Sequence, residues 1–223
     1  MRRISVLVEG QTEEKFIKEV LTPYLIKKST IKAINIQPVI IKTATSAKGV
    51  QRVGGYTTYA KMKKQIQTLL DSSDIVSMMF DYYGLPDDFP AISETSNMPI
   101  YAKIDYLYKN ASKNINNRKF IPYISLHEFE TLIFVDPAVS AKSLPIAKAE
   151  QSLRDVIRQF DNIEKINDGA TTHPSIRIAQ IYPEYKKDRE GIIITQKIGI
   201  DDIRSKCQNF DDWINRLLNA IQN

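Results

Sequence analysis

Short apolar runs alternate with amphipathic segments through the first 126 residues, and this alternation constrains the fold more than any other feature of the chain. Residues 4–8 are apolar and rich in β-branched side chains, which is typical of a strand buried on both faces. The run ends at Glu9-Gly10, and from Thr12 onward apolar side chains recur at helical spacing, with Thr12 as the expected N-cap. The segment therefore predicts a strand, a tight turn and a helix.

The same alternation repeats further along the chain. We expect strands at residues 34–41, 75–80 and 120–126, and helices at residues 57–70 and 99–115. Strands that are joined by helices pair in parallel through right-handed crossovers. The predicted fold class is α/β, with a mostly parallel four-stranded sheet flanked by helices.

The last third of the chain is more polar and helical. We expect helices at residues 146–160, 175–182 and 210–221, with a turn at Asn167-Asp168-Gly169. No internal repeat or long linker separates this part from the rest. We therefore predict an α/β core over residues 1–135 and a helical C-terminal appendage over residues 136–223 that packs on the core.

Composition excludes several classes of protein. A hydrophobic fraction of 43% and a charged fraction of 26% are those of an ordinary soluble protein. The single cysteine, Cys207, excludes a disulfide framework within the chain, and no uncharged apolar stretch approaches the roughly 20 residues that span a bilayer as a helix. The N-terminal residues also lack a secretory apolar region. A soluble, cytoplasmic protein with no membrane partner is the expectation.

The charge pattern favours a polyanionic partner. Thirty-one Lys and Arg against 26 Asp and Glu give a net charge of +5, and residues 42–64 hold six basic residues and no acid. The candidates in this tract for contact with nucleic acid are Lys48, Arg52, Lys61 and Lys64. A solvated loop and helix face would give the same pattern, so both interpretations stay open.

Acidic residues follow three of the predicted strands. Glu9 follows the first strand, Asp81 the third, and Glu128 and Glu130 come directly after the fourth, beside His127. Ligands of open parallel sheets bind at the carboxyl ends of the strands, so these acids are expected to lie near one another. Clustered carboxylates repel one another unless a cation lies among them, and hard oxygen ligands suit Mg²⁺ or Mn²⁺. A divalent metal site is therefore expected at this edge.

Other common chemistries do not fit. The chain has two histidines, His127 and His173, and one cysteine, which supply neither a zinc motif nor a Ser-His-Asp pattern. No GxxxxGK[ST] phosphate-binding loop is present.

Two segments of the chain resemble a known fold. ISVLVEGQTEE and IVSMMFDYYG resemble the Toprim fold that topoisomerases, bacterial primases and overcoming-lysogenization-defect nucleases share. More narrowly, VEGQTEEKF, FDYYGLP, HEFETLIF and the tail from THPSIRI through IYPEYKKD to Trp213 resemble domain-of-unknown-function family 4276, a Toprim-like group, over essentially the full chain. Members of this group are often encoded beside an ATPase and are linked to phage defence.

The resemblance implies roles for individual residues. Glu9 takes the place of the Toprim glutamate that holds metal and helps proton transfer, and Glu13 completes a Glu-x-x-x-Glu spacing that would hold a second metal. Asp81 corresponds to the first aspartate of an Asp-x-Asp motif. The sequence departs from the motif at the second aspartate, which is Tyr83 here.

We expect the missing carboxylate to come from Glu128 or Glu130, while Asp87 and Asp88 are weaker substitutes because they lie in a turn. Lys187, in a basic run near the C-terminus, is the candidate for contact with the scissile phosphate, although such runs are more often solvated faces.

The expected function is that of a metal-dependent nuclease that hydrolyses nucleic acid with Mg²⁺ or Mn²⁺, as the effector subunit of an ATPase-linked phage-defence system. Its partners would be nucleic acid and an ABC- or AAA-type ATPase encoded nearby, and homo-oligomerisation is left open. The alternative is a catalytically weak Toprim-like module that binds the partner ATPase. A primase-like nucleotidyl transferase is disfavoured because no template-binding zinc module is present.

Overall fold

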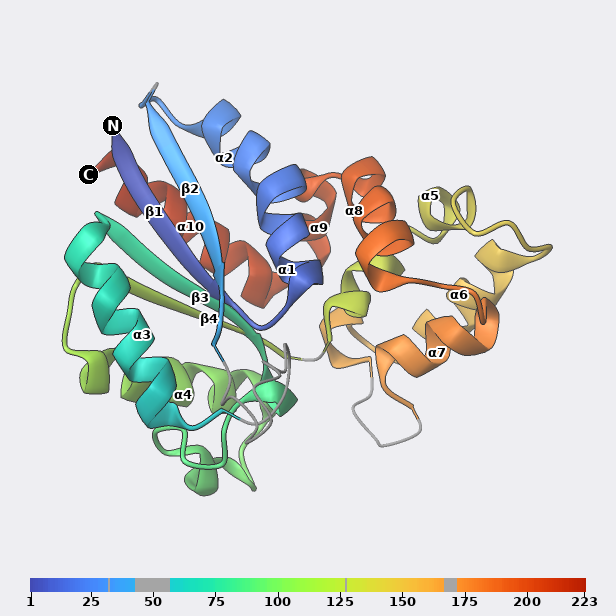
Figure 1. Ribbon diagram of the computed structural model, residues 1–223. Helices are drawn as coiled ribbons and strands as arrows, with labels where there is room; N and C mark the ends of the chain where they lie inside the picture. Colours follow the sequence, from blue (N-terminus) through green and yellow to red (C-terminus); the bar gives the residue numbers. More distant parts are fainter. Residues whose placement is uncertain (32, 43–56, 127, 167–171) are drawn as a thin grey trace, which may run out of the picture.

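A single parallel sheet organises the computed structural model, which describes residues 1–31, 33–42, 57–126, 128–166 and 172–223. The sheet has the strand order β2-β1-β3-β4 (Figure 1). Its strands are β1 (Arg2–Val8), β2 (Ile34–Ile40), β3 (Ile75–Asp81) and β4 (Phe120–Ser125). All three pairings are parallel, which confirms the predicted four-stranded parallel sheet.

The register places the ends of the strands at one edge. Val8 pairs with Ile40 on one side and with Met79 on the other, and Asp81 pairs with Ser125. Because β1 and β3 are neighbours, the residues that follow β1 lie beside the last residues of β3. Glu9 and Asp81 are thus brought to the same edge of the sheet.

The helix after β1 begins two residues earlier than expected, and a π-helical turn interrupts it. It consists of α1 (Gln11–Phe16), a π-helical turn (Ile17–Leu21) and α2 (Thr22–Lys28). Thr12 was the expected N-cap, and this was wrong: the cap is Gly10, which has an extended backbone, and Thr12 is buried in the first turn. Early entry into the helix draws the first turn of α1 into the edge where the strands end.

Two layers of helices cover the sheet (Figure 1). On one face, α3 (Tyr59–Ser72) and α4 (Ile100–Ile115) bury a core with the outward side chains of β3 and β4. On the other face, α1 and α2 share a core with α10 (Gln208–Gln222). Trp213 of α10 is fully buried there, stacks on Tyr123 of β4 at 4.3 Å between ring centroids, and donates its indole N–H to Ser77 Oγ at 2.9 Å.

The remaining elements lie between β3 and α4 or follow β4. Between β3 and α4 are two 3₁₀ turns, η2 (Tyr82–Gly84) and η3 (Ile92–Thr95). After β4 come η4 (Phe129–Val135), α5 (Pro137–Ala141), α6 (Ala149–Ile157), η5 (Ile163–Lys165), α7 (Pro174–Ile181), the π-helical turn η6 (Lys187–Gly191), α8 (Ile192–Ile198) and α9 (Ile200–Lys206). Helices α5 to α8 project to one side of the sheet in Figure 1. The predicted turn at residues 167–169 lies outside the described residues.

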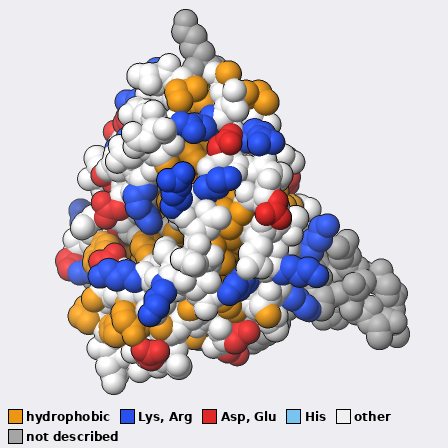
Figure 2. Space-filling model, turned by 90° about the vertical axis from the view of Figure 1, so that its left-hand side faces the viewer, with side chains coloured by type: hydrophobic (Ala, Val, Ile, Leu, Met, Phe, Trp, Pro, Cys, Tyr) orange, Lys and Arg blue, Asp and Glu red, His pale blue; other side chains and the backbone are white. Residues whose placement is uncertain are grey.

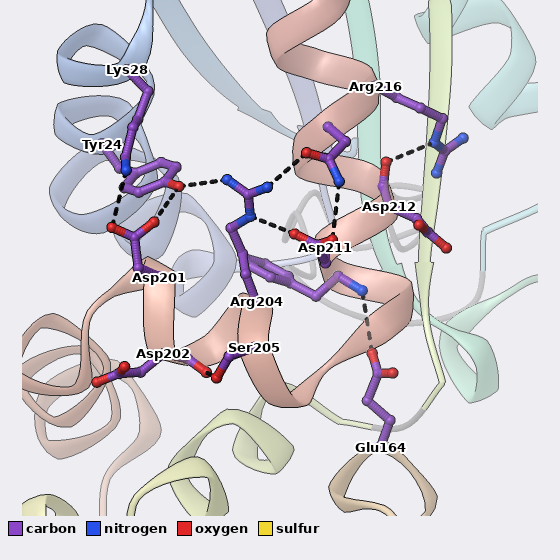
Figure 3. Close-up of polar contacts among 12 residues, drawn as sticks. Tyr24, Lys28, Glu164, Asp201, Asp202, Arg204, Ser205, Asp211, Asp212 and Arg216 are labelled. Atoms are coloured by element: carbon purple, nitrogen blue, oxygen red, sulfur yellow. Dashed lines mark hydrogen bonds and ion pairs between the residues drawn. The ribbon is translucent and has the colours of Figure 1, made fainter.

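Polar contacts tie the C-terminal helices to the N-terminal part of the chain (Figure 3). Arg204 of α9 donates to Asp211 of α10 at 2.5 Å and to the Tyr24 hydroxyl of α2 at 2.6 Å. The same hydroxyl donates to Asp201 Oδ1 at 2.7 Å. Residues on both sides of position 135 therefore share one core and one polar network. None of the helices in the described ranges is long and apolar enough to cross a membrane.

Candidate active site

A pocket of about 530 Å³ opens where β1 and β3 end. Glu9 reaches it from the end of β1, Asp81 from the last position of β3, and Glu13 from the first turn of α1. The full lining comprises Glu9, Gly10, Gln11, Thr12, Glu13, Asp81, Lys187 and Asp188. Three of the five predicted metal-ligand candidates thus line one pocket.

Two glycines allow the acidic side chains to pack closely. A methyl group on Gly84 would lie 3.0 Å from Glu9 Cδ, so the Glu9 carboxyl group rests directly against the backbone of η2. A methyl group on Gly10 would lie 3.3 Å from Glu13 Oε2. The absence of side chains at positions 10 and 84 therefore leaves room for both carboxyl groups.

The electrostatics of the pocket favour neutralisation of its acids. Burial, followed by the charge of Glu13, raises the pKa of Glu9, and Lys187 lowers it in part. Burial also raises the pKa of Asp81 well above its usual range, and Glu9, Glu13 and Glu130 raise it further. The positive charge near these carboxylates does not balance their negative charge. A bound cation would reduce the repulsion among them.

Lys187 is the cation that the fold itself supplies. It is the first residue of η6, 106 positions after Asp81 in the sequence, and it lines the pocket. Burial lowers the pKa of Lys187, but the charges of Glu130, Glu13, Asp81 and Glu9 outweigh this and raise it. The C-terminal part of the chain thereby delivers a positive charge to acids that come from the first 130 residues.

The turn that carries Lys187 is held by contacts with α1 and by a hydrogen bond within the turn itself. The Lys15 ammonium group on α1 donates to the backbone carbonyl of Asp188 at 3.0 Å and forms an ion pair with its carboxylate at 3.2 Å. The buried Glu190 accepts a hydrogen bond from the backbone N–H of Lys186 at 2.9 Å. Single-turn π-helices of this kind occur often at functional sites.

Glu128 and Glu130 lie farther back and do not line this pocket. The Glu128 carboxylate accepts a hydrogen bond from the backbone N–H of Ser175 at 2.8 Å and lies 3.1 Å from His173 Nδ1, so it is engaged at the start of α7. Glu130 is 3% exposed, and burial raises its pKa to about 7, against the charge of Lys187, which lowers it. Both nonetheless contribute negative charge to the cluster.

Tyr83 does not replace a carboxylate. Its side chain is 52% exposed and packs edge-to-face on Tyr82 at 5.1 Å between ring centroids. Asp88, the weaker substitute, accepts a hydrogen bond from the backbone N–H of Tyr59 at 2.8 Å and so anchors the start of α3. Neither Asp87 nor Asp88 lines the pocket.

The basic tract is described only in part. Lys48 and Arg52 lie outside the described residues, as does His127. Lys61 and Lys64 are exposed on the first turns of α3, whose start is tied by Asp88 to the segment that follows β3. Figure 2 shows the side of the molecule that faces left in Figure 1, where Lys and Arg side chains are spread over the surface with acidic and apolar side chains between them.

The donor set is chemically suited to a hard divalent cation, because Glu9, Glu13 and Asp81 offer only carboxylate oxygens. Within the described ranges, no group of three or more His, Cys, Asp or Glu side chains is already arranged to hold one ion. Mg²⁺ is usually bound by one or two carboxylates together with water and substrate phosphates, so two protein ligands are enough. Glu9 and Asp81 fit this pattern.

Several residues of the pocket were not predicted from the sequence. Gln11 and Thr12 line it because α1 begins two residues early, and Asp188 lines it because η6 folds back onto α1. Gly84 contributes by the absence of a side chain. Of these, the glycine beside a strand-end acid was visible in the sequence, whereas the position of Asp188 depends on tertiary structure.

One of three comparisons with known proteins shows a family for this chain. No curated protein matches the sequence significantly. Among solved structures, the C-terminal region of the Burkholderia pseudomallei OLD protein is similar, with a TM-score of 0.46, 13% sequence identity, and coverage of 98% of this chain and 99% of that one. Residues 8–218 match the family described as a domain of unknown function, DUF4276. Because the match extends over nearly the whole chain, this protein belongs to the DUF4276 family.

Proposed function

We propose that this protein is a nuclease that hydrolyses phosphodiester bonds in nucleic acid with the help of Mg²⁺ or Mn²⁺. The observation that carries the proposal is the convergence of Glu9 and Asp81, from the ends of two adjacent parallel strands, on one pocket with Glu13 and Lys187. The raised pKa values of Glu9 and Asp81 support it, since they indicate a cluster that gains stability when a cation binds.

Each residue has a role that follows from its position. Glu9 and Asp81 would hold the catalytic ion, and Glu13 would contribute to a second one. When bound, the ion supplies a Lewis acid for the phosphate and lowers the pKa of water. A Glu9 carboxylate oxygen would accept a proton from the attacking water. The Lys187 ammonium group pairs with a non-bridging phosphate oxygen and stabilises the charge that develops there.

The test is a cleavage assay on plasmid DNA, single-stranded DNA, single-stranded RNA and tRNA, with Mg²⁺ or Mn²⁺. EDTA should abolish cleavage. Glu9→Gln and Asp81→Asn keep side-chain shape but remove charge, and each should lower the rate at least about 100-fold. Lys187→Met should lower the rate with a smaller effect on substrate binding.

Glu14→Gln is the matched control. Glu14 lies next to Glu13 on α1, but its carboxylate pairs with Lys18 at 2.6 Å and does not line the pocket. The variant should cleave at nearly the wild-type rate. Wild-type cleavage by both Glu9→Gln and Asp81→Asn would show that the activity comes from elsewhere.

The wider proposal is that the protein acts in the cytoplasm as the effector subunit of an ATPase-linked phage-defence system. It rests on the sequence resemblance and on membership of the DUF4276 family. Cleavage should then depend on, or be strengthened by, an ABC- or AAA-type ATPase encoded beside it. Addition of the purified ATPase with ATP to the same assay tests this.

The alternative function is a catalytically weak module that binds the partner ATPase. The exposure of Tyr83 at the position of the second motif aspartate favours it, because one strand-end carboxylate is missing from the pocket. In this case neither metal nor ATPase elicits cleavage, and Glu9→Gln still binds the ATPase as tightly as the wild type. A Glu9-dependent cleavage product excludes the alternative.

A further inference from the structure

The turn η2 carries an aromatic side chain that the proposed chemistry does not use. Tyr83 is 52% exposed, whereas large aromatic side chains are usually mostly buried. The other exposed large hydrophobic side chains in the described ranges are aliphatic: Met1, Ile26 and Ile193. Tyr83 therefore presents an aromatic surface to solvent.

The backbone around Tyr83 is fixed against the acidic pocket. Asp81, which lines the pocket, precedes Tyr83 by two residues. Gly84, the next residue, packs so closely on the Glu9 carboxyl group that a methyl group on it would lie 3.0 Å from Glu9 Cδ. Tyr83 thus stands between two residues that contact or line the pocket, which places it at the rim.

Tyr82 braces the exposed ring. It is partly buried against the core of the face covered by α3 and α4, and its hydroxyl group lies 3.4 Å from Thr95 Oγ1. The two tyrosine rings meet at 83° in a T-shaped contact, with 5.1 Å between their centroids. A ring held in this way loses little conformational freedom when a flat ligand stacks on it.

A positive charge lies over the Tyr82 ring. The Lys103 ammonium group of α4 is 4.9 Å from the centroid of the Tyr82 ring. An exposed aromatic ring thus lies next to a residue that contacts a cation, and a ring and a cation suit a nucleobase and its phosphate.

We propose that Tyr83 is a base-stacking platform and that the pocket takes single-stranded nucleic acid rather than intact duplex. This inference rests on the proposed nuclease function. In a duplex both faces of each base are covered by neighbouring base pairs, so a base must be unstacked before it can lie on a protein ring. A braced ring beside a phosphodiester-cleaving site selects strands whose bases are already free. The residue at the place of the motif aspartate then recognises substrate instead of metal.

The test measures binding without cleavage. Glu9→Gln protein is titrated with a single-stranded 12-mer that carries 2-aminopurine, whose fluorescence is quenched by stacking, and with the matching duplex, both with Mg²⁺. Tyr83→Ala in this background should weaken single-strand binding about 5- to 100-fold and abolish the quenching. Tyr83→Phe and Tyr83→Trp should retain both, because stacking requires the ring and not the hydroxyl group. Duplex binding should be weaker and insensitive to all three changes.

The matched control is Tyr106→Ala, which removes a tyrosine of α4 whose hydroxyl group bonds to Glu94. It should leave binding unchanged, and thermal melting should show that each variant is folded. The proposal is overturned if Tyr83→Ala and its parent bind the single strand with equal affinity. It is also overturned if Tyr83→Ala weakens duplex binding as much as single-strand binding, or if the protein binds neither form.

The binding readout also separates this inference from the nuclease proposal. Glu9-dependent cleavage that is indifferent to Tyr83→Ala leaves the nuclease standing and removes the stacking platform. If the quenching depends on the Tyr83 ring but the protein never cleaves, the stacking platform stands and the nuclease proposal is removed.

Discussion

The two faces of the sheet are built in different ways. The face covered by α3 and α4 uses helices that lie in sequence between the strands they join, so its buried core consists of Leu7 and side chains from residues 41–126. The opposite face combines α1 and α2 with α10, which begins 83 residues after β4 ends. The second face therefore depends on contacts between distant parts of the chain, such as Trp213 with Tyr123.

The candidate site shows the same division. Its acids come from strand ends and from α1, within the first 130 residues, and its lysine comes from η6. The C-terminal segment thus completes both the core and the charge balance of the pocket. We therefore predict that the residues after 135 are needed for a stable fold and for the charge balance of the pocket.

The largest effect is expected from removal of the second face. A chain of residues 1–135 would expose the apolar side chains of β1, β3 and β4 that now face α10 and its neighbours. We expect it to lack cooperative unfolding and near-ultraviolet circular dichroism. Urea titration followed by circular dichroism measures this. A cooperatively folded 1–135 fragment would show that the first face is sufficient.

Trp213→Ala tests the same face by a smaller change, because it removes one buried side chain of α10 from the full chain. Its effect is measured by the same urea titration. It removes a fully buried side chain and leaves the Ser77 hydroxyl group without its indole donor. A loss of about 3–5 kcal/mol in the free energy of unfolding is expected.

The contrast between the faces also explains what the sequence could predict. The bounds of β2, β3, β4, α3 and α4 agree with the expected ranges to within two residues, because each is a local run with a clear period. Helices α5, α8 and α9 have five to seven residues each, too few for a helical period to be recognised. Residues 192–195 are even β-branched throughout, which favours a strand, yet tertiary packing of Ile192, Ile194 and Ile198 makes this segment helical.

The site divides along the same line. The position of Glu9 and Asp81 follows from strand ends in a parallel sheet, so periodicity alone brings them together. The position of Lys187 depends on the fold of η6 against α1, and no local pattern in the sequence encodes that contact. The role of every one of these residues stays a prediction.

The second prediction concerns the buried Glu130 carboxyl group and the pH dependence of stability. Glu130 is buried and has a pKa of about 7, against an ordinary value of 4.5. Its protonated form therefore stabilises the fold fully below pH 4.5, and this contribution is lost as the pH rises to about 7 and above. Glu130→Gln should raise the free energy of unfolding at pH 8 by about 3 kcal/mol and have little effect at pH 4.5.

Urea unfolding at a series of pH values with EDTA present measures this effect. Glu184→Gln, at an exposed position, is the control and should shift stability little at any pH. If the free energy of unfolding of Glu130→Gln depends on pH in the same way as that of the wild type, Lys187 neutralises Glu130 fully in the folded protein.

The third prediction concerns the contact that joins the two parts at the pocket. Lys15→Met removes the donor that holds the Asp188 carbonyl and carboxylate, so η6 and Lys187 should become less well positioned. We expect a loss of about 10-fold in kcat with little change in KM, together with faster amide hydrogen exchange in residues 187–191. Lys18→Met on the same helix removes only the surface pair with Glu14 and should change neither. Unchanged exchange in Lys15→Met would show that Glu190 alone holds the turn.

The smallest effect is expected on the first face, where Lys61 and Lys64 are exposed at the start of α3. If both contact phosphates of a bound single strand, Lys61→Glu combined with Lys64→Glu should reduce the slope of log affinity against log salt by about 1.4 and weaken binding at low salt. The control with equal charge change is Lys27→Glu combined with Arg118→Glu; these exposed residues lie near the amino ends of the strands, away from the pocket. It should lower affinity only through net charge, with a smaller change in slope. Equal slopes for the two double variants would mean that α3 is a solvated face, and that recognition of nucleic acid rests on the pocket and its rim.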